Sequence, residues 1–212
     1  MRGDKKGEPD VGMLRTCLHE GLIEAGVDEA GRGPLAGSVF AAAVILPPGY
    51  ENEAINDSKQ LSEHKRDELR AVIERDALAW AVASCSAQEI DSLNILRAAI
   101  EAMHRALDKL ELRPEAVIVD GNKFIPYRGL PCTTIVGGDG KYMAIAAASI
   151  LAKTYRDAEM KRLDKEFPQY GWARNKGYPT AEHRRAIEKY GPTPYHRMTF
   201  RLLPEKQLSL GL

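Results

Sequence analysis

The sequence predicts an α/β domain with a mixed sheet of about five strands, helices on its flanks and a helical C-terminal extension. Short apolar runs rich in β-branched residues come first, and strand-like and helix-like segments then alternate, which is the pattern of that class. A length of 212 residues suits one such domain with appendages. We therefore expect a loose leader over residues 1–20, a domain over 21–203 and a tail over 204–212.

The first half of the chain predicts three strands and one helix. Residues 22–28 and 38–46 are short apolar runs joined by a glycine-rich connection, and two prolines end the second run. A helix is expected from Ser62 to about residue 76, with an acidic residue in its first turn. Residues 78–84 alternate around Trp80 well enough to form a third strand.

The second half predicts two strands and three helices. Apolar side chains recur at helical spacing over 93–110, after a capping-box pattern at Ser86 and Glu89. The run 116–119 is uniformly apolar, as in a strand buried on both faces, and 132–136 is the next expected strand. The remaining helices are expected over 141–166, where many alanines allow close packing on the sheet, and over 181–190.

Composition excludes several classes of protein. Apolar residues make up 44% and charged residues 28% of the chain, which is ordinary globular usage and not that of a disordered or collagen-like chain. Three cysteines far apart support neither a disulfide framework nor a close-spaced zinc site. The chain also begins without an apolar signal core, and its longest mostly apolar run, 142–152, is too short for a membrane span. We therefore expect a cytoplasmic protein with no membrane partner.

The net charge is zero, but the charges are unevenly distributed. Residues 1–140 carry 16 basic and 23 acidic side chains, whereas residues 141–201 carry 13 basic and 6 acidic ones. An acidic part that holds metal ions and a basic part that faces phosphates would produce this gradient. Solvated helix faces sorted by chance would produce it as well.

Acidic residues stand at the ends of two predicted strands and on a nearby turn. Asp28 and Glu29 end the first strand, Asp120 follows the run 116–119, and Asp139 lies on a glycine-rich turn before the long helix. Open α/β sheets place their chemistry at the carboxyl ends of strands, so Asp28 and Asp120 converge if their strands are parallel neighbours. Clustered carboxylates are usually compensated by Mg²⁺ or Mn²⁺.

The same acids have a simpler interpretation. An Asp-Glu pair before a glycine turn also marks the end of a strand, and Asp120 is a suitable first residue of a turn. Since neighbouring residues of a strand point to opposite faces, Asp28 and Glu29 reach one metal only if the strand bends there.

Several other residues are candidates for contacts with a phosphate or a nucleotide. Arg32 supplies a cation between Gly31 and Gly33, which let a ligand approach the backbone. Lys59 lies in a polar loop, and the ring of Tyr178, beside a helix N-terminus, can stack on a sugar or base. Ordinary turns, helix capping and packing account for these residues equally well.

Two further groups carry weaker signals. His183, His196 and Arg197 are candidates for catalysis or phosphate binding, but no histidine pair has metal-binding spacing, so core or solvated histidines are the simpler interpretation. Lys153 and Asp157 lie four residues apart on one predicted helix, where a surface ion pair and an outer metal-site carboxylate are the two alternatives.

Taken together, these segments resemble the ribonuclease HII family, the bacterial type 2 ribonucleases H. The matching segments occur in family order and are GVDEAGRGPLAG (26–37), NDSKQLS (56–62), EIDSLNIL (89–96), VDGN (119–122), GGD (137–139), AAASILAKTYRD (146–157), FPQYGW (167–172), NKGYPT (175–180) and HRMTF (196–200).

The resemblance implies a ribonuclease H-like fold and an endonuclease that hydrolyses the RNA strand of RNA–DNA hybrids. It also implies cutting 5′ of single ribonucleotides embedded in duplex DNA, by two-metal-ion hydrolysis with Mn²⁺ or Mg²⁺ that leaves 3′-hydroxyl and 5′-phosphate ends. The residues that match the catalytic, metal-binding acids are Asp28, Glu29, Asp120 and Asp139. Those that match the substrate-binding positions are Gly31, Arg32 and Gly33, which recognise the 2′-hydroxyl, together with Lys59 and the junction-sensing Tyr178.

The chain departs from the family pattern around Asp139. Many members have Lys-Gly-Asp-Ser where this chain has Gly137-Gly138-Asp139-Gly140, so a phosphate-facing cation and a hydroxyl are missing. Lys141 is a candidate replacement for the cation. The departure bears on substrate affinity rather than on the chemistry.

The C-terminal tail is similar to the short peptides that bind the bacterial sliding clamp. The residues that carry this similarity are Gln207, Leu208, Leu210 and Leu212. An extended peptide of this kind places its leucines in a partner's pocket. Packing of the tail onto its own domain is the alternative.

Two other functions use some of the same features. A Holliday-junction resolvase or integrase-like nuclease also needs clustered acids and Mg²⁺, but has no reason to carry Gly-Arg-Gly beside Asp28 together with Tyr178. A binding module without catalysis predicts unchanged duplexes after incubation with Mn²⁺. We expect the enzyme that the resemblance implies, acting as a monomer.

Overall fold

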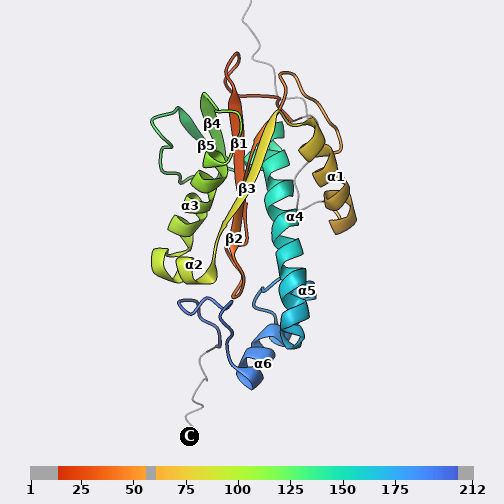
Figure 1. Ribbon diagram of the computed structural model, residues 1–212, viewed down its shortest axis with the longest axis vertical. Helices are drawn as coiled ribbons and strands as arrows, with labels where there is room; N and C mark the ends of the chain where they lie inside the picture. Colours follow the sequence, from red (N-terminus) through yellow and green to blue (C-terminus); the bar gives the residue numbers. More distant parts are fainter. Residues whose placement is uncertain (1–13, 56–60, 205–212) are drawn as a thin grey trace, which may run out of the picture.

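A five-stranded mixed sheet forms the centre of the computed structural model, which describes residues 14–55 and 61–204 (Figure 1). The strand order is β3-β2-β1-β4-β5, and the first three strands form an antiparallel meander to which β4 and β5 add in parallel. The strands are β1 (Glu24–Ala30), β2 (Val39–Ile45), β3 (Ala79–Cys85), β4 (Ala116–Asp120) and β5 (Cys132–Ile135). The predicted class and strand number are confirmed.

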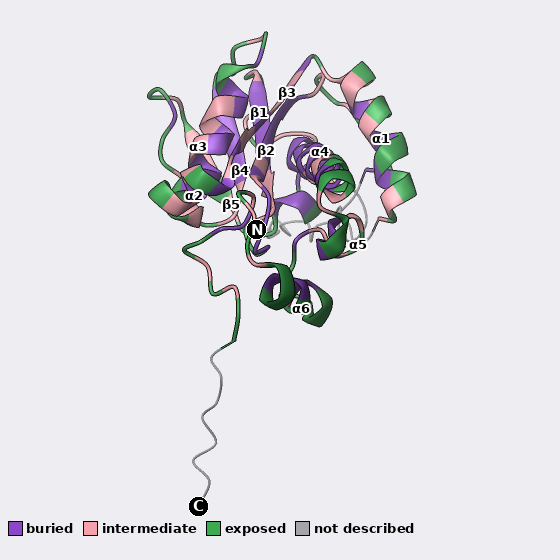
Figure 2. Ribbon diagram, turned by 60° about the horizontal axis from the view of Figure 1, so that its bottom comes forward, coloured by how far each residue is buried: buried purple, intermediate pink, exposed green. Residues whose placement is uncertain are grey.

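Helices cover both faces of the sheet, and each face has its own apolar core (Figures 1 and 2). On one face lie α2 (Ala87–Leu93) and α3 (Ile95–Asp108), and on the other lie α1 (Glu63–Asp76) and α4 (Met143–Glu166). Strands buried on both sides explain why the sequence of β4 is uniformly apolar before its final Asp120.

Close packing of α4 on β1 depends on Gly26. A Cβ atom at this position would overlap the backbone of Ala144 and Ile145, so only glycine permits the helix to lie this near. Side chains alternate along a strand, and Asp28 therefore points to the same side of the sheet as Gly26. The small residues at the start of α4 thus bring Ser149 within hydrogen-bonding reach of Asp28.

The C-terminal part forms a small helical extension beyond the sheet (Figure 1). It comprises the short 3-10 helix η2 (Pro168–Tyr170), α5 (Trp172–Asn175) and α6 (Ala181–Tyr190), and Thr180 caps α6 as expected. A third apolar cluster centred on Tyr170 and Trp172 holds this extension to the end of α4. Within the part of the chain that the structure describes, no helix has the length and apolar character needed to cross a membrane.

Two expected elements differ in the structure. The helix expected over 93–110 begins only at Ile95 and is separate from α2, because Asn94 adopts a φ of 68° and its side chain accepts hydrogen bonds from the amides of Leu96 and Arg97. An asparagine tolerates this conformation and starts a new helix as its N-cap.

Residues 14–20, expected to be part of a loose leader over 1–20, are instead held in place. Arg15 exchanges backbone hydrogen bonds with Lys141 and Met143, and Glu24 accepts from the amides of Leu18 and His19. These contacts tie the chain to the start of β1 and of α4. Residues 1–13 lie outside the described part.

Candidate active site

The acids at the ends of β1 and β4 line one pocket. β1 and β4 are parallel neighbours with Val27 beside Val119, so the residues that follow each of these, Asp28 and Asp120, meet at one edge of the sheet. The pocket has a volume of about 320 Å³, and Asp28, Glu29 and Asp120 all contribute to its wall. The convergence expected for parallel neighbouring strands is thus observed, and Glu29 contributes to the pocket as well.

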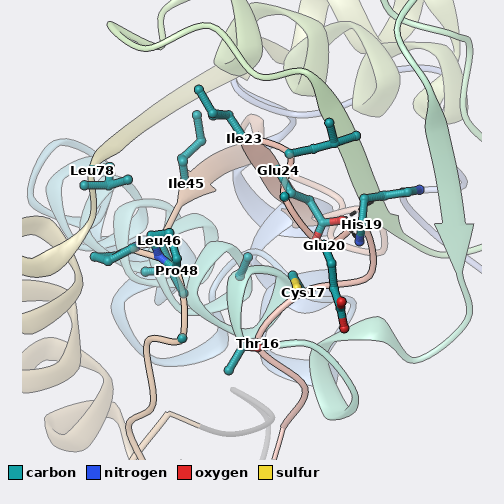
Figure 3. A pocket seen from close by; sticks show the side chains of 15 residues that line it. Thr16, Cys17, His19, Glu20, Ile23, Glu24, Ile45, Leu46, Pro48 and Leu78 are labelled. Carbon is teal, nitrogen blue, oxygen red and sulfur yellow. Dashed lines mark hydrogen bonds and ion pairs between the residues drawn. The ribbon is translucent and has the colours of Figure 1, made fainter.

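A second pocket lies at the opposite end of β1 and has a different character (Figure 3). Apolar side chains such as Ile23, Ile45 and Leu78 form much of its wall. Its buried acid, Glu24, already accepts hydrogen bonds from two backbone amides and from Nδ1 of His19. Two acidic side chains, Glu20 and Glu24, line this pocket, whereas four line the first one.

Burial and mutual repulsion destabilise the charged form of the acids in the first pocket. The pKa of Asp28 is raised well above its ordinary value, first by burial and then by the negative charges of Glu29 and Asp120. Burial also raises the pKa of Glu29, although the nearby Arg32 opposes this shift. A cation placed among these groups would reverse the repulsion.

Each of the three carboxylates accepts a hydrogen bond from an N–H group at the pocket. Oδ1 of Asp28 accepts from the amide of Glu29 at 2.7 Å, and Oδ1 of Asp120 accepts from the amide of Gly138 at 2.7 Å. Oε1 of Glu29 lies 3.3 Å from Nη1 of Arg32. Backbone amides thus orient Asp28 and Asp120, whereas a half-exposed side chain contacts Glu29.

Asp139 lies next to this pocket but is not among the residues that line it. It is buried in the 3-10 helix η1 (Gly138–Gly140), on the glycine-rich turn before α4 as expected. The bond from Gly138 to Asp120 ties this turn to β4.

Lys141, the candidate replacement for the missing cation, donates instead to the carbonyl of Val136 at 2.7 Å. The lysine that lines the pocket is Lys153.

The donor set fits a hard divalent cation. Mg²⁺ and Mn²⁺ prefer oxygen ligands, and carboxylates from two strands are the ligands offered here. Among residues 14–55 and 61–204, however, no three His, Cys, Asp or Glu side chains are already gathered tightly enough to hold one ion.

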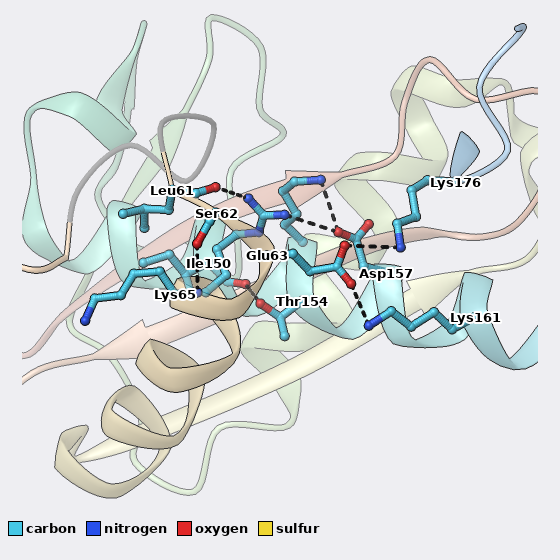
Figure 4. A network of polar contacts seen from close by, with 11 residues as sticks. Leu61, Ser62, Glu63, Lys65, Ile150, Thr154, Asp157, Lys161 and Lys176 are labelled. Atoms are coloured by element: carbon cyan, nitrogen blue, oxygen red, sulfur yellow. Dashed lines mark hydrogen bonds and ion pairs between the residues drawn. The ribbon is translucent and has the colours of Figure 1, made fainter. Parts of the chain in front are cut away.

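Asp157 belongs to the pocket wall and is held by basic groups, as Figure 4 shows. Its Oδ2 lies 3.3 Å from Nζ of Lys153 and 3.6 Å from Nη2 of Arg66, while its buried Oδ1 has no hydrogen-bond partner in the described part. The ion pair expected between Lys153 and Asp157 is present, but it does not lie at the surface, because the Asp157 carboxylate is 6% exposed and Arg66 from α1 also contacts it.

The Gly-Arg-Gly loop and Tyr178 lie beside the acids. Gly31 and Tyr178 line the same pocket, and Tyr178 remains 44% exposed, so its ring is accessible to a ligand. Gly31 has a φ of 99°, and a Cβ atom here would overlap the side chain of Arg156, so the position requires glycine. Arg32 extends outward from the loop with its side chain half exposed.

His183 and His196 are core residues, which is one of the two simpler alternatives that the sequence left open. Both are buried in the aromatic cluster of the C-terminal extension, and their Nε2 atoms lie 3.2 Å apart. His183 also accepts from Nε1 of Trp172, and its Nδ1 lies 2.9 Å from the carbonyl oxygen of Tyr178. The pair therefore supports the segment that carries Tyr178 and does not face the acidic pocket.

Sequence reasoning missed the role of two arginines. Arg156 lines the pocket, and Arg197 lies behind the Gly-Arg-Gly loop with its guanidinium fully buried. Arg197 was expected as a candidate for catalysis or phosphate binding, but its guanidinium donates to backbone carbonyls instead, and Arg156 was noted only as part of a matching motif. Lys59 and the tail residues Gln207, Leu208, Leu210 and Leu212 lie outside the described residues.

Comparisons with known proteins agree with this arrangement. The family model described as Ribonuclease HII matches residues 25–203. A ribonuclease HII of Bacteroides fragilis is 63% identical over 198 residues, covering 93% of this chain and 98% of the relative.

Two solved structures have the same fold. The ribonuclease H2 of Pyrococcus horikoshii matches with a TM-score of 0.71 at 26% identity, covering 84% of this chain and 94% of that one. The ribonuclease HII in a complex with PCNA from Archaeoglobus fulgidus matches with a TM-score of 0.69 at 29% identity, covering 88% and 98%.

The fold and the pocket therefore define an endoribonuclease with the ribonuclease H-like fold. Within that class, the chain belongs to the ribonuclease HII family. Its activity is endonucleolytic hydrolysis of the RNA strand of RNA–DNA hybrids, and the family and enzyme class expected from the sequence are confirmed.

Proposed function

We propose that this enzyme also cuts 5′ of single ribonucleotides embedded in duplex DNA, leaving 3′-hydroxyl and 5′-phosphate ends. The observation that carries the proposal is the shared pocket: Asp28, Glu29 and Asp120 line it together with Gly31 and Tyr178. Carboxylates suited to phosphodiester hydrolysis thus lie beside the backbone at Gly31 and the exposed ring of Tyr178, which are suited to recognising one sugar. Cleavage of a long hybrid does not require recognition of a single nucleotide.

The residues that would hold the divalent cations are Asp28, Glu29 and Asp120, with Asp139 joining them from the turn that Gly138 ties to Asp120. Mg²⁺ and Mn²⁺ both suit these oxygen ligands. When bound as a pair, such cations supply Lewis-acid charge for both the attacking water and the leaving 3′ oxygen of a phosphodiester. The role of the chain is to hold the carboxylates on β1, β4 and η1, so that few groups reorganise during the reaction.

Substrate selectivity is assigned to the loop of Gly31, Arg32 and Gly33 and to Tyr178. The 2′-hydroxyl is the group by which a protein distinguishes RNA from DNA at one position, and backbone amides beside glycines are accessible donors for it. Tyr178 is placed to stack on a neighbouring sugar or base. The basic segment 141–201 and Lys59 are assigned to the phosphate backbone, which makes binding dependent on salt.

The enzyme is proposed to work as a cytoplasmic monomer whose tail binds a sliding clamp. The tail proposal rests on the similarity of Gln207, Leu208, Leu210 and Leu212 to clamp-binding peptides, and the solved Archaeoglobus fulgidus relative is in a complex with PCNA.

One cleavage assay tests the proposal. A DNA duplex with a single ribonucleotide is incubated with the enzyme and Mg²⁺ or Mn²⁺, and the cut is mapped at nucleotide resolution. We expect one cut 5′ of the ribonucleotide, no cut in the all-DNA duplex, and loss of cleavage in Asp28→Asn. Cutting of the all-DNA duplex would instead favour a junction-resolving nuclease, and an intact ribonucleotide duplex beside a cut RNA–DNA hybrid would refute the proposal.

A further inference from the structure

Arg197 packs against the back of the Gly-Arg-Gly loop and is fully buried. Its Nη2 donates to the carbonyl of Gly31 at 2.6 Å and its Nη1 to the carbonyl of Arg32 at 3.0 Å. Its Nε and Nη2 also reach the carbonyl of Gly37, at 3.0 and 2.9 Å. The Arg197 guanidinium therefore binds carbonyls at both ends of the segment from Gly31 to Gly37.

These contacts are unusual for a buried cation, because every one of them goes to a backbone carbonyl and none to a carboxylate. Burial, followed by the nearby charge of Arg156, lowers the pKa of Arg197 to about 9. Burying a charge in this way is costly, and an apolar side chain would fill the space at less cost. Arginine is nevertheless suited to this position, because no other side chain supplies several hydrogen-bond donors in one plane.

The direction of the carbonyls determines the direction of the amides. In a trans peptide, C=O and the following N–H point to opposite sides. Since the carbonyls of Gly31 and Arg32 point at Arg197, the amides of Arg32 and Gly33 point away from it. Within residues 14–55 and 61–204, no acceptor takes a hydrogen bond from either amide.

The loop is also fixed relative to Tyr178. The amide of Leu35 donates to the carbonyl of Gly177 at 2.8 Å, and Nη2 of Arg156 donates to the carbonyl of Lys176 at 2.9 Å. A Cβ atom at Gly33 would lie 3.5 Å from the ring of Tyr178, in ordinary contact. The two outward amides therefore lie beside the ring that borders the acidic pocket.

We propose that Arg197 is the positioning residue for ribose recognition: it holds the carbonyls of Gly31 and Arg32 inward so that the amides of Arg32 and Gly33 donate to the 2′-hydroxyl. The inference rests on the proposed function of this loop and adds the residue that orients it. Arg197 itself touches neither the substrate nor the metal.

The test compares Arg197→Lys with a matched control, Arg184→Lys. Lysine keeps the charge but lacks the planar set of donors. Arg184 is a suitable control because it also donates to two carbonyls, those of Arg201 and Leu202, without contacting the loop. The dissociation constants of an all-DNA duplex and of the same duplex with one ribonucleotide are measured by fluorescence anisotropy in EDTA. Thermal melting identifies folded variants.

We expect the wild type and Arg184→Lys to prefer the ribonucleotide duplex, and Arg197→Lys to bind both duplexes equally. We also expect kcat/KM on the ribonucleotide duplex to fall about tenfold in Arg197→Lys, the size of one lost hydrogen bond. A folded Arg197→Lys that keeps the wild-type preference would overturn the inference alone. A wild type without any preference would instead refute the proposed recognition by the loop.

A second measurement does not depend on whether the variant folds. In ¹⁵N-labelled wild-type protein, we expect the amide resonances of Arg32 and Gly33 to shift on adding the ribonucleotide duplex and to shift less with the all-DNA duplex. Equal shifts with the two duplexes would overturn the assignment of these amides to the 2′-hydroxyl.

Discussion

Lowering the pH from 7 to 5 should destabilise the protein through His196. Its Nδ1 accepts from the amide of Thr193 at 2.9 Å, and its Nε2 lies 3.2 Å from Nε2 of His183. Nδ1 of His183 lies 2.9 Å from the carbonyl of Tyr178, which identifies that nitrogen as the protonated one and leaves Nε2 as an acceptor. In the neutral form of His196, Nδ1 is free to accept from the Thr193 amide, and a second proton on Nδ1 would oppose that amide.

The size of the effect follows from the pKa. Burial, followed by the nearby His183, lowers the pKa of His196 from 6.5 to about 4. The unfolded chain therefore binds more protons than the folded one between these values, so stability is present above pH 6.5 and is lost as the pH falls. For this single group the loss between pH 7 and pH 5 is about 2 kcal/mol.

Urea unfolding at pH 7 and pH 5 measures this loss. His196→Asn keeps an acceptor near Nδ1 but cannot titrate, so its loss of unfolding free energy between the two pH values should be smaller than that of the wild type by about 2 kcal/mol. His64→Asn, at an exposed histidine of α1, is the matched control and should behave as the wild type does. Equal losses in the wild type and His196→Asn would refute the reasoning.

Four further outcomes are expected. Asp28→Asn should lower the cleavage rate by about a thousandfold or more. It should also raise the melting temperature, because it removes a buried negative charge that lies near two others, and an unchanged or lower melting temperature would contradict this argument. Gly26→Val should lower stability by about 1–3 kcal/mol in urea unfolding, since its side chain overlaps α4. Gly31→Ala should reduce kcat/KM on the ribonucleotide duplex, because positive φ and the Arg156 side chain both oppose the new methyl group, and an unchanged kcat/KM would count against the loop. Deleting 207–212 should abolish pull-down by a sliding clamp and spare hydrolysis, and retained pull-down would end the clamp proposal.

The position of the acids could be predicted because it depends on a local pattern and one topological rule. An apolar run followed by an acid identifies the end of a buried strand, and parallel pairing brings Asp28 and Asp120 to one edge. The absence of metal-binding spacing likewise predicted that His183 and His196 are not metal ligands, but it left open whether they are core or solvated residues, and the structure shows them in the core.

Other features could not be predicted, because they depend on partners that the sequence does not record. The acceptors of Arg197 are carbonyl oxygens of residues 31, 32 and 37, which every residue type possesses. The start of α3 after Asn94 is likewise not visible in the apolar pattern, which already includes Leu93. The ion pair of Asp157 with Lys153 was expected at the surface, and only the fold brings Arg66 from α1 beside it.

The most direct test of the central claim is the location of bound Mn²⁺ in crystals of the protein, read from anomalous scattering. If the acids at the ends of β1 and β4 form the catalytic centre, anomalous peaks should appear among Asp28, Glu29 and Asp120, and they should weaken or vanish in Asp120→Asn. Peaks confined to other sites, or unaffected by that substitution, would contradict the account.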